Sequence, residues 1–220
     1  MVQKRVEPKR GHVTASLVKR PRGRPRAYDP DVALRRALET FWTKGYSRAS
    51  LDDLVIATGM NRPSLYAAFG DKQALYLSAL ENYWEQSLRL MRELLSHDEP
   101  LSLALMRVYD AALSFYFPAN HPPRGCFGIN TAAVESVVEP RIRAALEGGL
   151  RKIDKEFERR IAVSISRGEL PGSVDPRALA EIASAILHSL AIRARCGATR
   201  RELRLLAERA LAHSLQAARA

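Results

Sequence analysis

Hydrophobic side chains recur three or four positions apart along most of the chain, which is the spacing of amphipathic α-helices. The longest such stripe predicts a helix over residues 72–95, which would be about 36 Å long. Its hydrophobic positions are Leu75, Ala79, Leu80, Tyr83, Trp84, Leu88, Met91 and Leu95. The alternating pattern of a β-strand occurs nowhere in the sequence. The chain is therefore predicted to be all-α.

Residues that suit helix starts and ends divide the chain into about nine segments. Ser50 and Asp175 suit N-caps, and Gly45 and Gly168 suit helix ends. One long segment contains glycines at 148–149, which cost about 2 kcal/mol relative to alanine, so we expect a kink or a close helix contact there. The predicted segments are residues 29–44, 50–58, 61–69, 71–95, 101–117, 126–138, 140–167, 176–196 and 199–220.

Two short segments between residues 50 and 72 have the pattern of a helix-turn-helix. Gly59 provides the break, because glycine adopts a left-handed turn conformation without steric cost. Asn61 suits the N-cap of the second helix, and Pro63 lies in its first turn, where a missing N–H is harmless. Leu65 and Phe69 then face inward. The outer side of this helix is polar and basic, as a DNA-reading surface would be.

The charge of the chain points to the same class of partner. Its net charge is +11, and residues 1–26 contain nine Lys or Arg and one Glu, which leaves +3 for the rest. A basic, proline-containing segment without hydrophobic periodicity predicts a disordered arm over residues 1–27. Residues 21–26 resemble an AT-hook, in which Arg22, Arg24 and Arg26 would enter the minor groove of A·T-rich DNA. The alternative is a generic phosphate-binding arm.

Other classes of protein find little support in the sequence. No apolar run of seven or more follows the basic start, and no stretch is apolar enough to span a membrane, so we expect no membrane partner. Cys126 and Cys196 are too few for a disulfide scaffold, which favours a cytoplasmic setting. Neither a glycine-rich phosphate loop, a nucleophile elbow nor a zinc-ligand spacing occurs. We therefore expect no enzyme activity, no cofactor and no metal site.

The order of motifs in residues 28–75 resembles the head of the TetR/AcrR family of transcriptional regulators. The matching pieces are Gly-Tyr at 45–46, Ser-Leu-Asp-Asp-Leu at 50–54, Thr-Gly-Met-Asn-Arg-Pro-Ser-Leu-Tyr at 58–66 and Phe-Gly-Asp-Lys-Gln-Ala-Leu at 69–75. The resemblance implies an arm (1–27), a three-helix DNA-binding domain (28–74) and a helical ligand-binding and dimerisation domain (75–220). Val55, Pro63 and the alanines at 67–68 depart from the usual pattern, which affects the expected operator sequence rather than the fold.

The helix-turn-helix also predicts which residues contact DNA. Phosphate contacts are expected from exposed hydroxyl and basic groups, and base contacts from the start of the second helix. The phosphate group comprises Arg48, Ser50, Tyr66 and Lys72. The base-reading group comprises Arg62 and Ser64, with Asn61 and Pro63 beside them. A dimer would place two such helices about 34–36 Å apart on a near-palindromic site.

The last two predicted helices carry stripes of leucine and isoleucine interleaved with alanine, which suits close helix packing. The family resemblance implies a two-fold homodimer through a four-helix bundle formed by these helices. The alternative is an ordinary core within one chain. The stripe residues are Leu179, Ile182, Ile186, Leu190, Leu203, Leu206, Ala210 and Leu211.

The resemblance further implies an unidentified small-molecule effector inside the C-terminal bundle. The absence of acidic clusters among the candidate wall residues favours a neutral or anionic apolar ligand. Candidate wall residues are Tyr83, Trp84, Phe115, Cys126 and Phe127, each of which could instead be plain core. Cys126 has a second interpretation as a thiol or metal sensor, with Arg124 lowering its pKa and His121 or Cys196 as partners. The competing interpretation is a buried structural thiol.

These observations predict a ligand-responsive repressor that binds a near-palindromic operator as a dimer and leaves it when the effector binds. The runner-up is an architectural protein that binds A·T-rich DNA through the arm without any ligand response. A C-terminal domain as long as residues 75–220 disfavours the runner-up, because architecture alone does not require it.

Overall fold

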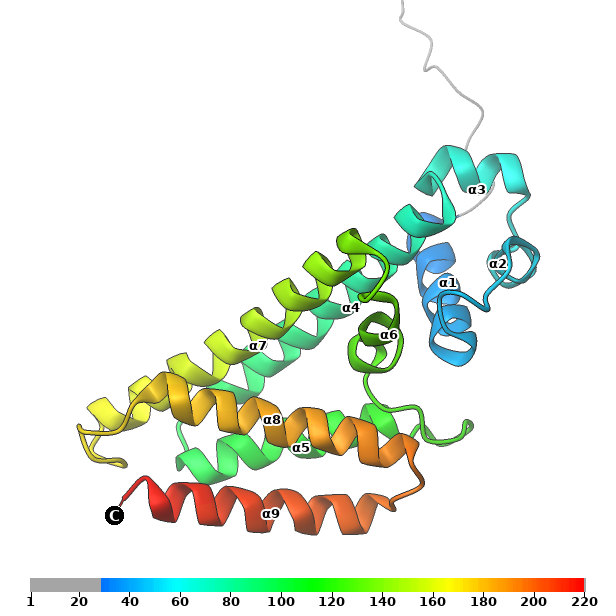
Figure 1. The fold of residues 1–220 in the computed structure, drawn as a ribbon. Helices are drawn as coiled ribbons and strands as arrows, with labels where there is room; N and C mark the ends of the chain where they lie inside the picture. The colour runs from blue at the N-terminus through cyan, green and yellow to red at the C-terminus, as the bar shows by residue number, and fades with distance from the viewer. Residues whose placement is uncertain (1–28, 220) are drawn as a thin grey trace, which may run out of the picture.

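The computed structural model describes residues 29–219, and every regular element within that range is helical (Figure 1). The elements follow the predicted order, with one π-helical turn, η1, before α6. Their bounds are α1 (Pro30–Lys44), α2 (Leu51–Thr58), α3 (Arg62–Phe69), α4 (Lys72–Leu95), α5 (Leu101–Tyr116), η1 (Gly128–Ala132), α6 (Ala133–Glu135), α7 (Pro140–Ser166), α8 (Pro176–Arg195) and α9 (Arg200–Ala217). The prediction of an all-α chain is confirmed for these residues.

The predicted caps hold the head together. Ser50 begins α2 with a capping box, in which its hydroxyl accepts from the Asp53 N–H and its own N–H donates to the Asp53 carboxylate. The Asn61 side chain accepts from the Ser64 N–H at the start of α3. Between these helices Gly59 has φ of +70°, a left-handed conformation that strains other residues. The helix-turn-helix therefore follows from local sequence signals.

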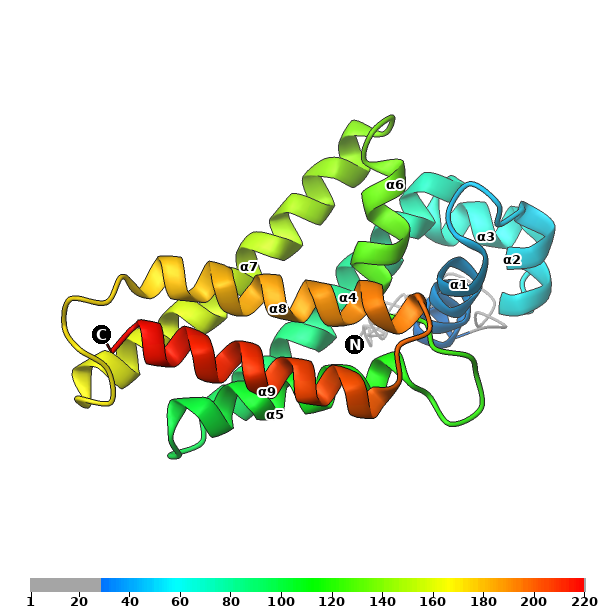
Figure 2. The same cartoon turned by 60° about the horizontal axis from the view of Figure 1, so that its bottom comes forward.

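The head formed by α1, α2 and α3 sits at one end of α4, which runs unbroken from it into the bundle (Figure 1). Helices α4 and α7 lie side by side, and α8 packs across α7. Helix α9 packs on α5 and α8 at the side away from the head (Figure 2). None of the helices in the described part is long and apolar enough to cross a membrane.

An aromatic cluster joins the head to the bundle. The Phe41 and Tyr76 rings meet edge to face at 5.1 Å, and Trp42 of the head meets Tyr83 of α4 at 5.3 Å. Phe127 is fully buried against Trp42, Tyr76 and Tyr83. Because these rings come from α1, α4 and the segment before η1, the head and the bundle share one hydrophobic core.

Trp84 packs against one of the two adjacent glycines of α7. A Cβ on Gly149 would lie 2.2 Å from Trp84 Cε2, and a Cβ on Gly128 of η1 would lie 2.3 Å from Trp84 Cζ2. The indole is therefore clamped between two glycines that leave it just enough room. Gly148 has open space beside it. The expected close helix contact is confirmed at Gly149, within a continuous α7.

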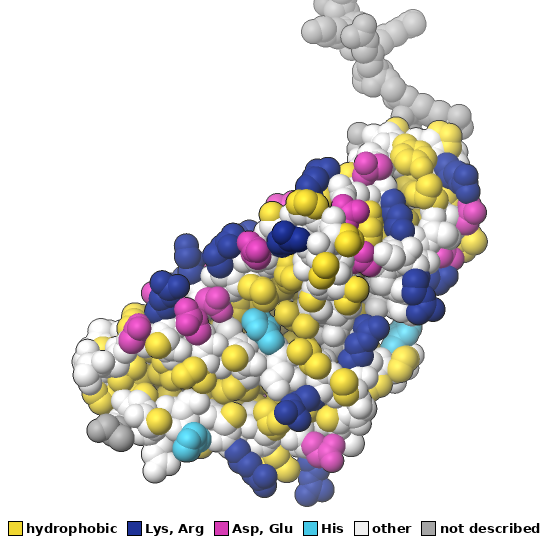
Figure 3. Space-filling model, viewed as in Figure 1, with side chains coloured by type: hydrophobic (Ala, Val, Ile, Leu, Met, Phe, Trp, Pro, Cys, Tyr) yellow, Lys and Arg dark blue, Asp and Glu magenta, His cyan; other side chains and the backbone are white. Residues whose placement is uncertain are grey.

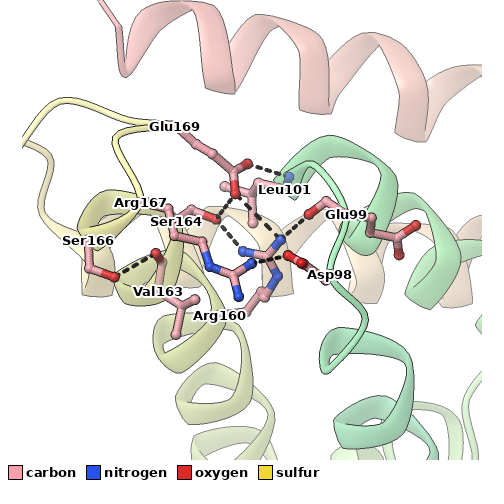
Figure 4. A network of polar contacts seen from close by, with 9 residues as sticks. All are labelled: Asp98, Glu99, Leu101, Arg160, Val163, Ser164, Ser166, Arg167 and Glu169. Carbon is pink, nitrogen blue, oxygen red and sulfur yellow. Dashed lines mark hydrogen bonds and ion pairs between the residues drawn. The ribbon is translucent and has the colours of Figure 1, made fainter.

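At the far end of the bundle a buried arginine ties several elements together (Figure 4). Arg160 of α7 is only 4% exposed, and its guanidinium donates to the Glu99 carbonyl oxygen at 2.5 Å and to the Ser164 hydroxyl. The Glu169 carboxylate lies 3.7 Å from the same guanidinium and accepts from the Leu101 N–H at 2.7 Å. This network fastens the start of α5 to the end of α7.

The predicted stripes of α8 and α9 face largely into the chain's own bundle. Of the eight residues proposed for a dimer interface, five are buried within the chain: Leu179, Ile186, Leu190, Leu203 and Leu211. Ile182 is 46% exposed, while Leu206 and Ala210 are half-buried. The surface of these two helices also exposes Ile192 and Leu205, which periodicity alone did not single out.

Candidate DNA-binding surface and effector cavity

Helix α3 presents its outer side to solvent because Leu65 anchors its inner side in the core of the head. Tyr66 is 44% exposed, and Arg62 and Pro63 are exposed at the first turn. Figure 3 shows Lys and Arg side chains around the head and along α7, and hydrophobic side chains both on the head near its tip and across the middle of the same face. The predicted base-reading helix therefore stands free at the tip of the molecule.

Several predicted DNA contacts already have partners within the head. The Arg62 guanidinium lies 2.6 Å from the Asp52 carboxylate, which raises the pKa of Arg62. The hydroxyl and N–H of Ser50 and the side chain of Asn61 serve as helix caps. Lys44 beside Asp53 lowers the pKa of that carboxyl to about 2, so the capping box stays ionised at neutral pH.

Lys72 lies folded back on the head. Its Nζ is 3.4 Å from the Ser47 carbonyl oxygen and 4.6 Å from the centroid of the Tyr46 ring, and burial lowers its pKa. Arg48 is exposed in the segment between α1 and α2. Tyr66 lies on α3 itself, and Lys72 begins α4 directly after it. The three arginines of the predicted arm, at positions 22, 24 and 26, lie outside the described residues.

A cavity of about 70 Å³ lies inside the bundle, bounded by α4, α5, α7 and α8. Four of the five predicted wall residues line it: Tyr83, Trp84, Phe115 and Cys126. Phe127 does not, because it is buried in the aromatic cluster beside it. Residues that the sequence analysis missed complete the wall: Ser87, Leu90, Met91, Leu94, Val108, Ala111, Ala112, Tyr116, Ile153, Leu187 and His188. Their helical spacing marked many of them as apolar, but spacing does not distinguish a cavity wall from a filled core.

The environment of Cys126 differs from the sensor hypothesis. The Tyr83 hydroxyl donates to Cys126 Sγ at 3.2 Å, and burial raises the pKa of the thiol. Arg124 turns away, with its guanidinium 3.8 Å from the centroid of the Trp42 ring and 2.5 Å from the Glu39 carboxylate. The expectation that Arg124 lowers the Cys126 pKa is therefore wrong. Among residues 29–219, no three His, Cys, Asp or Glu side chains gather as a metal site.

The segment after the cavity contacts the head directly. Glu135 of α6 accepts from the Ser47 N–H at 3.2 Å and from its hydroxyl at 2.7 Å. Tyr76 of α4 and Thr131 of η1 share a hydrogen bond of 2.7 Å, which stays buried. Because Gly128 of the same η1 holds Trp84, one short segment touches both the cavity wall and the head.

Comparison with known proteins identifies the family. The profile described as bacterial regulatory proteins, tetR family, matches residues 33–79, and that of the tetracyclin repressor-like C-terminal domain matches residues 103–211. The chain belongs to the TetR family of transcriptional regulators. It is thus a DNA-binding transcriptional regulator. Because the members of this family are regulators and not enzymes, the expectation that the chain is not an enzyme is confirmed.

Relatives of this TetR-family regulator match it over most of its length. The HTH-type transcriptional repressor ComR of Escherichia coli is 33% identical over 194 residues, which span 88% of this chain and 92% of ComR. The uncharacterised HTH-type regulator YezE of Bacillus subtilis is 28% identical over 68% of this chain and 77% of its own length. A structure of a cysteine mutant of the TetR-family regulator CifR with 26-bp operator DNA is 32% identical, with a TM-score of 0.77 over 86% of this chain and 98% of that one.

Proposed function

We propose that this TetR-family regulator is a ligand-responsive repressor, which binds a near-palindromic operator as a homodimer and leaves it when a small molecule occupies the cavity. One observation carries this proposal. Helix α4 runs without a break from Lys72, beside the head, to Trp84 and Leu94 in the cavity wall. A change in the cavity can therefore reach the DNA-binding helices through one rigid element.

The proposed DNA surface consists of α3 and its flanks. Arg62 and Ser64 read bases, with Asn61 and Pro63 shaping the start of the helix. Arg48, Tyr66 and Lys72 contact phosphates, and Ser50 supports them as a cap rather than as a ligand, since its N–H is already used. For Arg62 and Lys72, DNA competes with the Asp52 carboxylate and the Ser47 carbonyl oxygen for the positive charge.

The proposed homodimer forms through α8 and α9, using the hydrophobic residues that the chain leaves at the surface. These are Ile182, Ile192 and Leu205, with half-buried Leu206 and Ala210 beside them. A two-fold dimer would present two α3 helices to successive major grooves of one DNA face. The five stripe residues that are buried in the chain support this interface from beneath.

The proposed coupling uses the segment from Gly128 to Glu135. A ligand that shifts Trp84 displaces Gly128, because the indole has no free space on that side. The movement reaches Ser47 through Glu135 and Tyr76 through Thr131. Release of DNA requires that the ligand prefer the shifted arrangement, since a ligand with equal affinity for both arrangements changes nothing.

Two observations favour this function over its alternatives. The cavity and its contact path to the head have no role in an architectural protein. Burial and a raised pKa make Cys126 a poor nucleophile, so a structural thiol bound to the Tyr83 hydroxyl is the better interpretation. If alkylation of Cys126 in the folded protein released operator DNA, this interpretation of the thiol would be wrong.

Lys72 provides a test of the DNA surface. Lys72→Ala is expected to weaken binding to all DNA sequences and to lower the slope of log affinity against log salt by about 1, because one phosphate contact is lost. Fluorescence anisotropy across a salt series measures both quantities. Lys152→Ala removes the same charge from an exposed position on α7 and should leave the slope unchanged. Equal slopes for the two variants would remove Lys72 from the phosphate ligands.

The arm provides a second test. Deletion of residues 1–26 is expected to reduce operator affinity most where the flanks are A·T-rich, because their narrow minor groove attracts arginine. Binding to operators that differ only in their flanks, measured at one salt concentration, separates the possibilities. An equal loss on every flank would leave only a generic basic arm.

A further inference from the structure

We infer that the effector is a small uncharged molecule with a hydrogen-bond acceptor, which it presents to the Trp84 indole N–H in the cavity. This inference rests on the proposed function, since it names the kind of ligand for the same site. It narrows the sequence-based expectation, which allowed neutral and anionic ligands alike.

Within the described chain, the Trp84 indole offers an unpartnered hydrogen-bond donor. Trp84 is 4% exposed, yet its Nε1 has no hydrogen-bond partner among the described residues. His188 Nε2 is also buried without a partner within that range, and both side chains line the same cavity. A buried N–H is costly when it stays unpaired, so a ligand acceptor at Trp84 would be stabilised. An indole N–H donates only, which defines the ligand group as an acceptor.

The cavity wall, as far as the described residues form it, also lacks a charge that could balance an ionic ligand. Among residues 29–219, no Arg, Lys, Asp or Glu lines the cavity. A buried carboxylate would have no cation beside it there, and an uncompensated ion is strongly disfavoured in an apolar site. Burial also lowers the pKa of His188, partly opposed by Asp154, so its imidazole is neutral and supplies no counter-charge at neutral pH. The site therefore selects against anions.

The volume of the cavity limits the size of the ligand. The cavity volume of about 70 Å³ is under half of the roughly 150 Å³ of an engineered cavity that holds benzene. The comparison therefore favours a ligand with fewer than the six non-hydrogen atoms of benzene. Gly128 and Gly149 lie against the indole, and its Nε1 is on the Gly149 side, 2.5 Å from where a Cβ on Gly149 would be. The occupant is therefore compact.

The ligand reaches the cavity from the side of the head. An open groove of about 870 Å³ between α1, α2 and α4 shares Tyr83, Ser87 and Phe115 with the cavity wall. Phe115 is 48% exposed, which leaves its ring free to swing at the boundary between the two spaces. This position makes Phe115 the residue that a ligand passes.

Because the chain has only two tryptophans, ligand binding at Trp84 can be followed directly by NMR. Each contributes one indole N–H signal to a ¹H–¹⁵N spectrum, and Trp42 serves as the reference because its indole already donates to the Arg124 carbonyl oxygen at 3.4 Å. The probes are acetone, acetamide, isobutene and acetate, which share the same number of non-hydrogen atoms. Trp84→Phe assigns the signals and removes the proposed donor.

Acetone and acetamide are expected to move the Trp84 proton downfield with dissociation constants of about 1 mM, since so few atoms make few contacts. Isobutene is expected to bind without that downfield shift, and acetate not to bind. His188→Leu should weaken acetone binding at least about threefold by removing the second polar group. The exposed control His213→Leu should not change it.

An acetate effect as large as that of acetone, or an unmoved Trp84 signal at saturating acetone, would overturn the inference. Operator binding separates this result from the proposed function. If acetone moves the Trp84 signal but leaves operator affinity unchanged, the ligand class holds and the ligand response fails. If no probe binds Trp84 yet another molecule releases operator, the repressor function holds and the ligand class fails.

Discussion

The cavity and the far end of the bundle treat buried polar groups in opposite ways. At the far end, Arg160 is buried with a carbonyl, a hydroxyl and a carboxylate around its guanidinium. In the cavity, the buried nitrogens of Trp84 and His188 have no partners within the described chain. The first arrangement favours one geometry strongly, whereas the second leaves binding capacity unused. The difference indicates that the far end is the fixed base of the domain and the cavity is its adaptable part.

The distribution of contacts to the head follows the same division. The segment from Gly128 to Glu135, which touches Trp84, also reaches Ser47 of the head and Tyr76 near the start of α4. The Arg160 network instead joins the start of α5 to the end of α7, away from the head (Figure 4). A ligand-induced movement in the cavity can therefore reach the head through few contacts, while the Arg160 network keeps the far end of the bundle fixed.

The largest expected effect comes from breaking the fixed end. Arg160→Ala should lower the free energy of unfolding by about 3 kcal/mol, because the Glu99 carbonyl oxygen and the Ser164 hydroxyl lose a buried donor. Urea unfolding at one fixed protein concentration measures this, which matters if the chain dimerises. Arg159→Ala, one residue earlier and exposed, should stay within about 0.5 kcal/mol.

Operator affinity sharpens this first prediction. The folded Arg160→Ala protein should bind operator as the parent does, since its network makes no contact with the head. A stability loss accompanied by a tenfold loss of operator affinity would contradict the division between a fixed end and an adaptable cavity. A loss no larger than that of Arg159→Ala would contradict the role of the network itself.

The glycine pair of α7 gives an intermediate effect and a matched control. Gly149→Ala should destabilise by about 1–2 kcal/mol, because overpacking against the Trp84 ring outweighs the gain in helix propensity. Gly148→Ala meets nothing within 4 Å and should stabilise by about 0.5–1 kcal/mol. Thermal and urea unfolding of the two variants measure effects of opposite sign. Similar effects at both positions would show that Trp84 is not clamped.

This pair also marks how far the sequence leads. The caps at Ser50 and Asn61 and the start of α4 were predictable, because each depends on residues a few positions apart. The unusual glycines of α7 predicted a close contact, but Trp84, which contacts Gly149, lies far away in the sequence. Helical spacing marks each side of that contact separately and does not bring them together. The sequence therefore indicated where α7 makes a close contact but not that Trp84 is the contacting residue.

The cavity shows the same limit more strongly. His188 occupies a helix position among apolar residues, and nothing near it in the sequence signals an unpaired nitrogen. Phe127 resembled a wall residue but is buried against three rings, Trp42 of α1 and Tyr76 and Tyr83 of α4. The π-helical turn at Gly128 also lies against Trp84, which is far away in the sequence. Sites formed by several distant helices need the tertiary structure.

The smallest expected effect lies at the contact between α6 and the head. Glu135→Gln keeps one acceptor oxygen for Ser47 but removes the charge that strengthens both hydrogen bonds, so about 0.5–1 kcal/mol of local stability should be lost. Because the contact is at the surface and joins two parts of the molecule, the loss should appear as local opening rather than as global unfolding. Hydrogen exchange of the Ser47 and Arg48 amides is the sensitive measurement.

Exchange at these amides should accelerate about two- to fivefold in Glu135→Gln, which corresponds to the same free energy. Ser136→Ala is the control, because within the described part of the chain the Ser136 hydroxyl bonds only to the Ala133 carbonyl oxygen of its own turn. In a double-mutant cycle, Ser47→Ala combined with Glu135→Gln should cost less than the sum of the two single variants, since both remove one interaction. Additive costs would mean that α6 does not hold the head through this pair, and the proposed route from the cavity would then run through the Tyr76–Thr131 hydrogen bond and α4 alone.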